Sequence, residues 1–72
     1  MLGMLFSDQE GKELDYLLRK ELDELALDLN DKRIDADIRV ALKERFKRIY
    51  RIYARFGSKK ELARYSAIMG RR

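Results

Sequence analysis

The 72-residue chain contains no cysteine, histidine, tryptophan or proline. Without cysteine and histidine it has no thiol nucleophile, no imidazole base and none of the usual protein ligands of zinc, haem iron or iron–sulfur clusters. Nothing in the spacing of its carboxylates, lysines and tyrosines indicates catalysis. We therefore expect a protein that is not an enzyme and that binds no metal and no cofactor.

Long hydrophobic runs are absent as well. No stretch approaches the roughly 18 apolar residues that a membrane span requires. The apolar start, residues 1–6, is too short for the hydrophobic region of a signal peptide and has no basic residues before it. We expect a cytoplasmic protein without membrane contact, and one without a small-molecule substrate, because two or three helices leave little room for a cleft.

What the chain does contain is typical of helices. Hydrophobic residues make up 46% and charged residues 42% of the sequence, which is too apolar for a disordered tail. We expect a single small all-α domain over residues 1–72. A chain below roughly 70 to 80 residues rarely gains more than a few kcal/mol from its core. Since disulfides and structural zinc are excluded, the remaining routes to stability are very good helix packing and self-association. We expect a homodimer that forms a helical bundle.

The first helix is expected at about 8–29. Ser7 followed by Glu10 has the spacing of a capping box, in which both side chains bond to backbone N–H groups of the first turn. Leucines then recur at intervals of three and four residues and form one apolar stripe. Asn30 and the polar residues after it favour a turn.

The second helix is expected at about 35–56 and the third at about 59–69. Asp35 can cap the second helix, and Gly57 predicts its end, because glycine enters the left-handed conformation without steric cost. Ser58 and Glu61 repeat the capping-box spacing, and Gly70 predicts the end of the third helix. The short link makes the two long helices an antiparallel hairpin, with the third helix folding back across its open end.

One acid and one base interrupt the apolar stripes of the two long helices. On a helical wheel Glu21 falls between leucines and Arg45 between isoleucines, and neither has an opposite charge three or four residues away. If the hairpin closes at residues 31–34, positions whose numbers sum to about 65 lie level with each other. We therefore predict a buried structural ion pair between Glu21 and Arg45 that fixes register or subunit orientation. The alternatives are that the two long side chains reach the solvated rim of the stripes, or that they form a binding site.

The charges are divided along the chain. Residues 1–37 hold 11 acidic and 5 basic residues, whereas residues 38–72 hold 2 acidic and 12 basic residues. Basic residues stand at four-residue spacing on the second helix, where like charges destabilise a helix, and the basic stretch continues into the third. The resulting candidate ridge comprises Arg39, Lys43, Lys47, Arg48, Arg51, Arg55, Lys59, Lys60 and Arg64.

Two hypotheses for function follow. In the first, the chain is a protein-protein interaction or regulatory module, and the acidic first helix neutralises the ridge. In the second, the ridge contacts the phosphates of a nucleic acid, and Tyr50, at the border of the apolar stripe, stacks on unpaired bases. Apolar residues outside the main stripes are candidates for the dimer or partner contact: Leu2, Met4, Leu5, Phe6, Tyr16, Leu27 and Val40.

Overall fold

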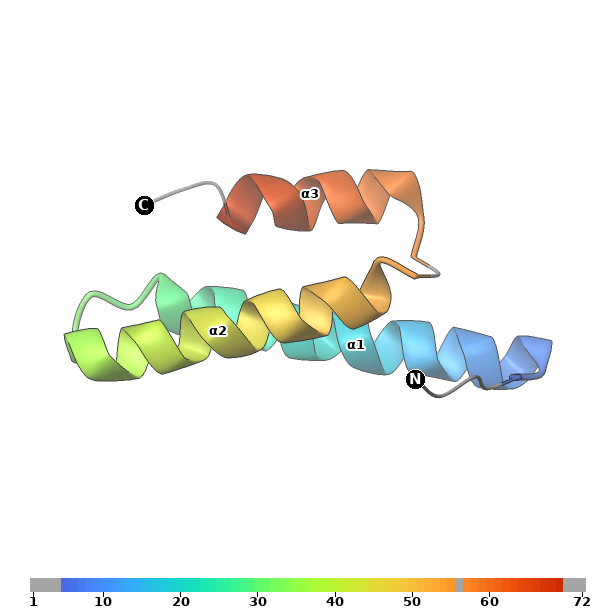
Figure 1. Ribbon diagram of the computed structural model, residues 1–72, viewed down its shortest axis with the longest axis horizontal. Coiled ribbons are helices and arrows are strands. Elements are labelled where there is room, and N and C mark those ends of the chain that lie inside the picture. Colours follow the sequence, from blue (N-terminus) through green and yellow to red (C-terminus); the bar gives the residue numbers. More distant parts are fainter. Residues whose placement is uncertain (1–4, 56, 70–72) are drawn as a thin grey trace.

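The protein folds into three helices in the computed structural model, which describes residues 5–55 and 57–69 (Figure 1). Helix α1 spans Asp8–Leu29, α2 spans Ala36–Tyr53 and α3 spans Lys59–Met69. The described part of the chain contains no strand. The expected all-α hairpin with a short third helix is therefore confirmed.

The start of α1 follows directly from its sequence. The Ser7 side chain accepts a hydrogen bond from the Glu10 backbone N–H at 3.1 Å, and the Glu10 carboxylate accepts one from the Ser7 N–H at 2.9 Å. Both bonds of the capping box are present, so two N–H groups that the helix itself cannot pair are satisfied. Asn30 caps the other end of α1.

The ends of α2 differ from the prediction. Asp35 precedes the helix, but its carboxylate makes no capping hydrogen bond. The helix stops at Tyr53, earlier than the expected 56, and Phe56 lies outside the described residues, as does Gly70. Gly57 does not adopt a left-handed conformation. Its role is space: a β-carbon at position 57 would lie 2.6 Å from the Tyr53 ring, which is closer than any real contact.

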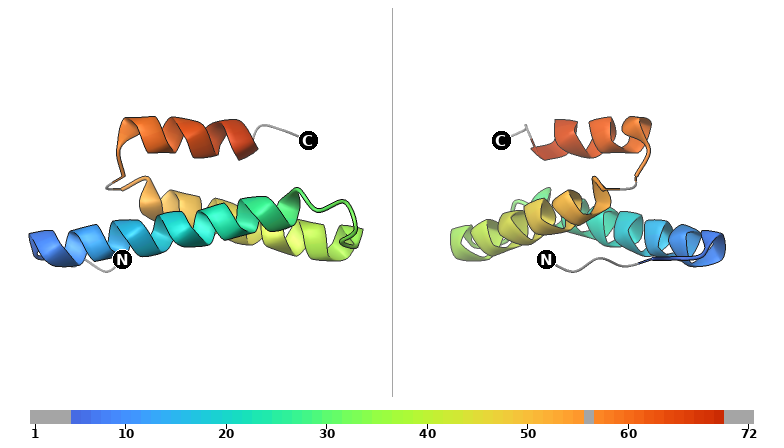
Figure 2. Two further views of the ribbon diagram at one scale, coloured as in Figure 1. Left: turned by 180° about the vertical axis from the view of Figure 1, so that it is seen from behind. Right: turned by 45° about the vertical axis from the view of Figure 1, so that its right-hand side comes forward.

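The third helix takes a different place from the predicted one. α1 and α2 pack as an antiparallel pair, and α3 begins near the open end of this hairpin and then runs back along one of its faces (Figures 1 and 2). It therefore covers a face and does not close the open end. Tyr65 of α3 explains the difference, because its ring is fully buried against the hairpin.

The core lies where α3 meets the hairpin. The Tyr65 ring packs edge-on against Phe46, with ring centroids 6.3 Å apart, and against Tyr53 at 6.1 Å. Edge-to-face packing at these distances is favourable for aromatic rings. The buried cluster consists of Leu22, Leu25, Phe46, Ile49, Tyr53 and Tyr65. No helix in the described part of the chain is both long and apolar enough to cross a membrane.

Candidate interaction surfaces

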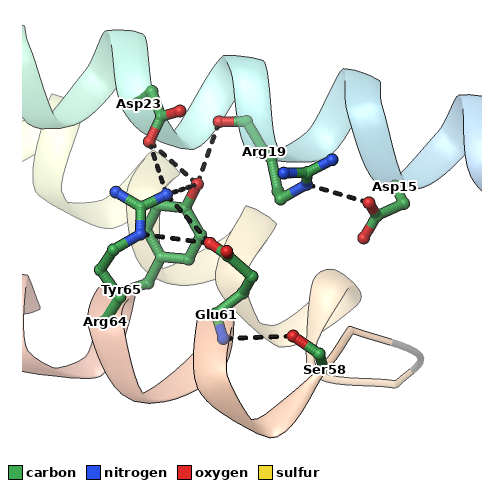
Figure 3. A network of polar contacts seen from close by, with 7 residues as sticks. All are labelled: Asp15, Arg19, Asp23, Ser58, Glu61, Arg64 and Tyr65. Carbon is green, nitrogen blue, oxygen red and sulfur yellow. Dashed lines mark hydrogen bonds and ion pairs between the residues drawn. The ribbon is translucent and has the colours of Figure 1, made fainter.

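A polar network ties α3 to α1 around Tyr65 (Figure 3). The Tyr65 hydroxyl lies 2.9 Å from Asp23 Oδ1 and 3.3 Å from the Arg19 carbonyl oxygen, so it donates to α1. It accepts a hydrogen bond from the Arg64 guanidinium at 2.7 Å. The ring is therefore held by apolar packing below and by polar contacts at its rim.

Arg64 is the centre of this network. Its guanidinium contacts Asp23 Oδ1 at 3.2 Å and Glu61 Oε1 at 3.1 Å, and it lies 4.4 Å from the centre of the Tyr65 ring. The Ser58 hydroxyl accepts from the Glu61 N–H at 3.2 Å, which is one bond of the predicted capping box. The Glu61 carboxylate is bonded to Arg64 (Figure 3).

A second carboxylate on α1 holds the other buried tyrosine. Burial and a hydrogen bond to Asp15 raise the pKa of Tyr53 to about 12. Burial, followed by the hydrogen bond to Asp23, raises the pKa of Tyr65 from its ordinary value too. Asp15 also pairs with Arg19 at 2.9 Å. Two carboxylates a little over two turns apart on α1 thus anchor α2 and α3.

Sequence reasoning missed this network. In the sequence Asp15 and Asp23 count only among the acidic residues of the first helix that could neutralise the basic ridge, and Tyr65 lies 42 residues from Asp23 along the chain. The available signal was that Tyr65 and Tyr53 carry a hydroxyl that must find a partner when the ring is buried.

Arg39 does not belong to a free basic ridge. Its guanidinium donates hydrogen bonds to the carbonyl oxygens of Leu29 and Asp31, the latter at 2.8 Å. These carbonyls lie at and just beyond the end of α1, where the helix leaves its last C=O groups unpaired. Arg39 therefore caps α1 from the start of α2.

The remaining ridge residues fall into groups. Arg64 is committed to the network described above, and Lys43 and Lys47 are partly buried. The others are exposed on α2, on the part of its surface turned away from the core, and at the start of α3. No described carboxylate forms an ion pair with any of them. This exposed group is Arg48, Arg51, Arg55, Lys59 and Lys60.

Tyr50 is not a free stacking platform. Its ring is partly buried and packs against the core cluster, and its hydroxyl lies 3.5 Å from the Leu62 carbonyl oxygen. Tyr16 is the exposed tyrosine on α1, with 54% of its surface accessible.

Glu21 and Arg45 meet across the hairpin, with Arg45 Nε donating to Glu21 Oε2 at 3.2 Å. The pair is not buried, because the two side chains are 36% and 55% exposed respectively. The helical wheel placed both within the apolar stripes, but this part of each stripe points away from α3. An exposed pair of this kind contributes only about 0 to 1 kcal/mol to stability in isolation.

This pair lies at the centre of the side of the hairpin opposite α3, which we call the far face. Residues three and four apart form one strip on each helix there, and none of them belongs to the core cluster or packs against it. The strips are Leu14, Leu17, Glu21, Glu24 and Asp28 on α1, and Ile38, Ala41, Arg45, Arg48 and Ile52 on α2.

The far face combines apolar and charged side chains in an ordered way. Leu17, Ile38 and Ile52 are 49%, 50% and 46% exposed, although each is a large apolar side chain. Every charged residue of the α1 strip is acidic, and every charged residue of the α2 strip is basic. At one end of the face Leu14 and Leu17 of α1 lie near Ile52 of α2, and at the other end Glu24 and Asp28 of α1 lie level with Ala41 and Ile38 of α2. The Glu21–Arg45 pair lies between the two ends.

The apolar residues that the sequence suggested for a partner contact lie elsewhere. Tyr16, Leu27 and Val40 are 54%, 72% and 62% exposed, and helical spacing places the first two on the outer side of α1 and the third on the outer side of α2. Tyr16 and Leu27 line one open pocket on α1, and Val40 is not part of it. Leu5 and Phe6 are exposed before α1, and Leu2 and Met4 lie outside the described residues.

A shallow groove of about 530 Å³ lies between the hairpin and the second half of α3. Its apolar residues include Leu29, Phe46 and Ile68, and its cations are Arg39, Lys43 and Arg64. Two of these cations already serve the α1 cap and the Tyr65 network, so Lys43 is the one uncommitted cation among the described residues that line the groove.

Comparisons of this chain with protein-family models, with curated proteins and with solved structures find no match. Its function must therefore be argued from its own surfaces.

Proposed function

We propose that this protein is a non-enzymatic protein-protein interaction module that binds its partner through the far face. The observation that carries the proposal is that only one of the two hairpin faces is covered by α3. α3 covers one of them, while the other leaves Leu17, Ile38 and Ile52 about half exposed beside an ordered set of charges.

The small core supports the same proposal. Six hydrophobic side chains are buried in the described part of the chain, and a core of that size leaves little stability in reserve. Covering further apolar surface contributes about 25 cal/mol per Å² removed from water. The far face is the surface where such a gain is available together with charge pairing.

Site-specific photo-crosslinking in the native cell tests this proposal. A photoreactive side chain replaces Leu17 on the far face or, as a matched control, Lys20 on the outer side of the same helix. We expect a discrete adduct from position 17 that mass spectrometry identifies as protein, and no such adduct from position 20. No adduct at position 17, or equal adducts at both positions, would overturn the proposal.

The exposed basic group supports a second candidate, nucleic-acid binding. Arg51, Arg55 and Lys59 are among its members near the turn between α2 and α3, where no described carboxylate pairs with them. Basic side chains grouped in this way attract the phosphate backbone. The arrangement offers phosphate contacts, while Tyr50 supplies no free ring for base stacking.

A salt titration with mixed oligonucleotides distinguishes this candidate. If it is correct, affinity falls steeply with salt, and Arg51→Glu lowers the slope of log K against log salt by about 1. Lys20→Glu, an equal charge change on the outer side of α1, leaves the slope closer to that of the wild type. No binding at about 50 mM salt excludes the candidate.

A further inference from the structure

We infer that the far face is covered by a second copy of this chain, related to the first by a twofold axis that runs parallel to the hairpin helices. This inference rests on the proposed function and names its partner. It also fixes which helix of one subunit lies against which helix of the other.

The register of the hairpin supplies the first step. Glu21 and Arg45 are in contact, so in two antiparallel helices of equal rise per residue every pair of positions with the same sum is level. Leu14 is then level with Ile52, and Glu24 is close to level with Ala41. We call each such level pair on the far face, one residue from α1 and one from α2, a rung.

The second step concerns the symmetry. Rotation by 180° about an axis parallel to the helices leaves every height unchanged and exchanges left with right. Each residue of α1 therefore faces its own rung partner on α2 of the other subunit: Glu21 faces Arg45 of the partner subunit, and Leu14 faces Ile52 of the partner subunit. The central ion pair becomes a closed group of two acids and two bases, and the apolar end formed by Leu14 and Ile52 covers its copy.

The alternative axis gives the opposite electrostatics. A twofold axis that lies in the interface and crosses the helices at the level of the ion pair places α1 against α1. Glu21 then faces Glu21 of the partner subunit, and Arg45 faces Arg45 of the partner subunit. Like charges placed opposite each other in an interface oppose association. The charge pattern therefore selects the parallel axis.

Charge also favours a second copy over an unrelated partner. A uniformly acidic partner would match the α2 strip but oppose the acidic α1 strip, and a uniformly basic partner would do the reverse. A copy of this chain carries both signs at the required spacing. The result is a four-helix bundle of two hairpins with one α3 on each outer side. At its centre Glu21 of each subunit faces Arg45 of the other.

Crosslinking of purified full-length protein tests the arrangement, because the chain has no native cysteine. E24C is mixed with A41C or with L17C, and a bis-maleimide spanning the roughly 8 to 10 Å between packed helices is added. We expect E24C to link to A41C and not to L17C. Linkage to L17C instead would show the crossed axis and overturn the inference, as would linkage to neither.

Charge variants test the energetics. Sedimentation equilibrium of the wild type is expected to give twice the chain mass of 8.6 kDa. R45E is expected to raise the dimer dissociation constant at least tenfold, and R51E, the same change on the outer side of α2, to alter it less than threefold. The swap E21R/R45E restores both the pair within the chain and the dimer, which separates lost association from lost folding.

Mixing the swapped and wild-type chains gives a further outcome. With the parallel axis the mixed dimer opposes Arg to Arg and Glu to Glu, so native mass spectrometry should find it about tenfold below the statistical share. A mixed dimer at or above that share contradicts the inference. A monomer by sedimentation whose position 17 still crosslinks to a different protein in cells overturns this inference and leaves the proposed function standing.

Discussion

Replacing Tyr65 tests how α3 is held, because this side chain combines a buried ring with a buried hydroxyl. Its accessible surface is 0%, and its ring contacts Phe46 and Tyr53. Removal of a large buried aromatic side chain costs about 3 to 5 kcal/mol. Since a chain of this size holds only a few kcal/mol in total, Tyr65→Ala is expected to release α3 or unfold the protein.

Tyr65→Phe separates the two contributions. It keeps the ring and removes the hydroxyl that contacts Asp23, the Arg19 carbonyl oxygen and Arg64. The Asp23 and Arg64 side chains are 51% and 50% exposed and can bind water instead. The expected cost is about 1 kcal/mol, the typical net value of one hydrogen bond. Tyr16→Ala is the matched control, because the Tyr16 side chain is 54% exposed and its loss should change stability by less than about 0.5 kcal/mol.

Urea unfolding followed by circular dichroism measures all three variants, and limited trypsin digestion reports on α3, which contains Lys59, Lys60 and Arg64. The order expected is Tyr65→Ala far below Tyr65→Phe, with Tyr16→Ala close to the wild type. Equal effects of the first two would show that the hydroxyl and not the ring holds α3. A Tyr65→Ala protein as stable as the wild type would refute the packing argument altogether.

Three further outcomes are expected. Because the pKa of Tyr53 is raised to about 12 in the folded state, the stability that it contributes is complete below pH 10 and falls as pH rises toward 12, by about 1.4 kcal/mol per pH unit at most; urea unfolding at pH 9 to 12 should show this fall reduced in Tyr53→Phe and unchanged in Tyr16→Phe. Gly57→Ala forces a β-carbon to 2.6 Å from a packed ring and should cost about 1 to 3 kcal/mol by thermal unfolding, so a neutral result would contradict the close approach. Arg39→Ala leaves the carbonyls at the end of α1 without their donor and should cost about 2 kcal/mol, with Arg39→Lys intermediate because an ammonium cannot fork to both, and indistinguishable unfolding curves would argue against the cap.

Local features of the sequence predicted local structure well. The capping box at Ser7 and the first helix it opens need only neighbouring residues, and both are present as expected. The hairpin register also followed from counting, since the length of the link determines which positions are level. The same counting placed Glu21 beside Arg45 without knowledge of any contact.

Features that depend on where α3 packs could not be predicted in the same way. A helical wheel places Glu21 within an apolar stripe, but it does not show which part of the stripe a third helix will cover. The pair was therefore expected inside the core and lies on the far face. The Asp23–Tyr65 contact and the Arg39 cap could not be predicted for the same reason, because each joins residues that come together only after the chain has folded.

The Arg39 cap couples completion of the last turn of α1 to closure of the hairpin. An isolated segment ending near residue 33 contains all of α1 but lacks the guanidinium that its last carbonyls receive. The last turn of α1 is therefore completed by Arg39 of α2, so α1 reaches its full stability only when α2 has folded back against it. Cutting the chain in the link between α1 and α2 should leave the last turn of α1 frayed, however strong the helix propensity of its residues.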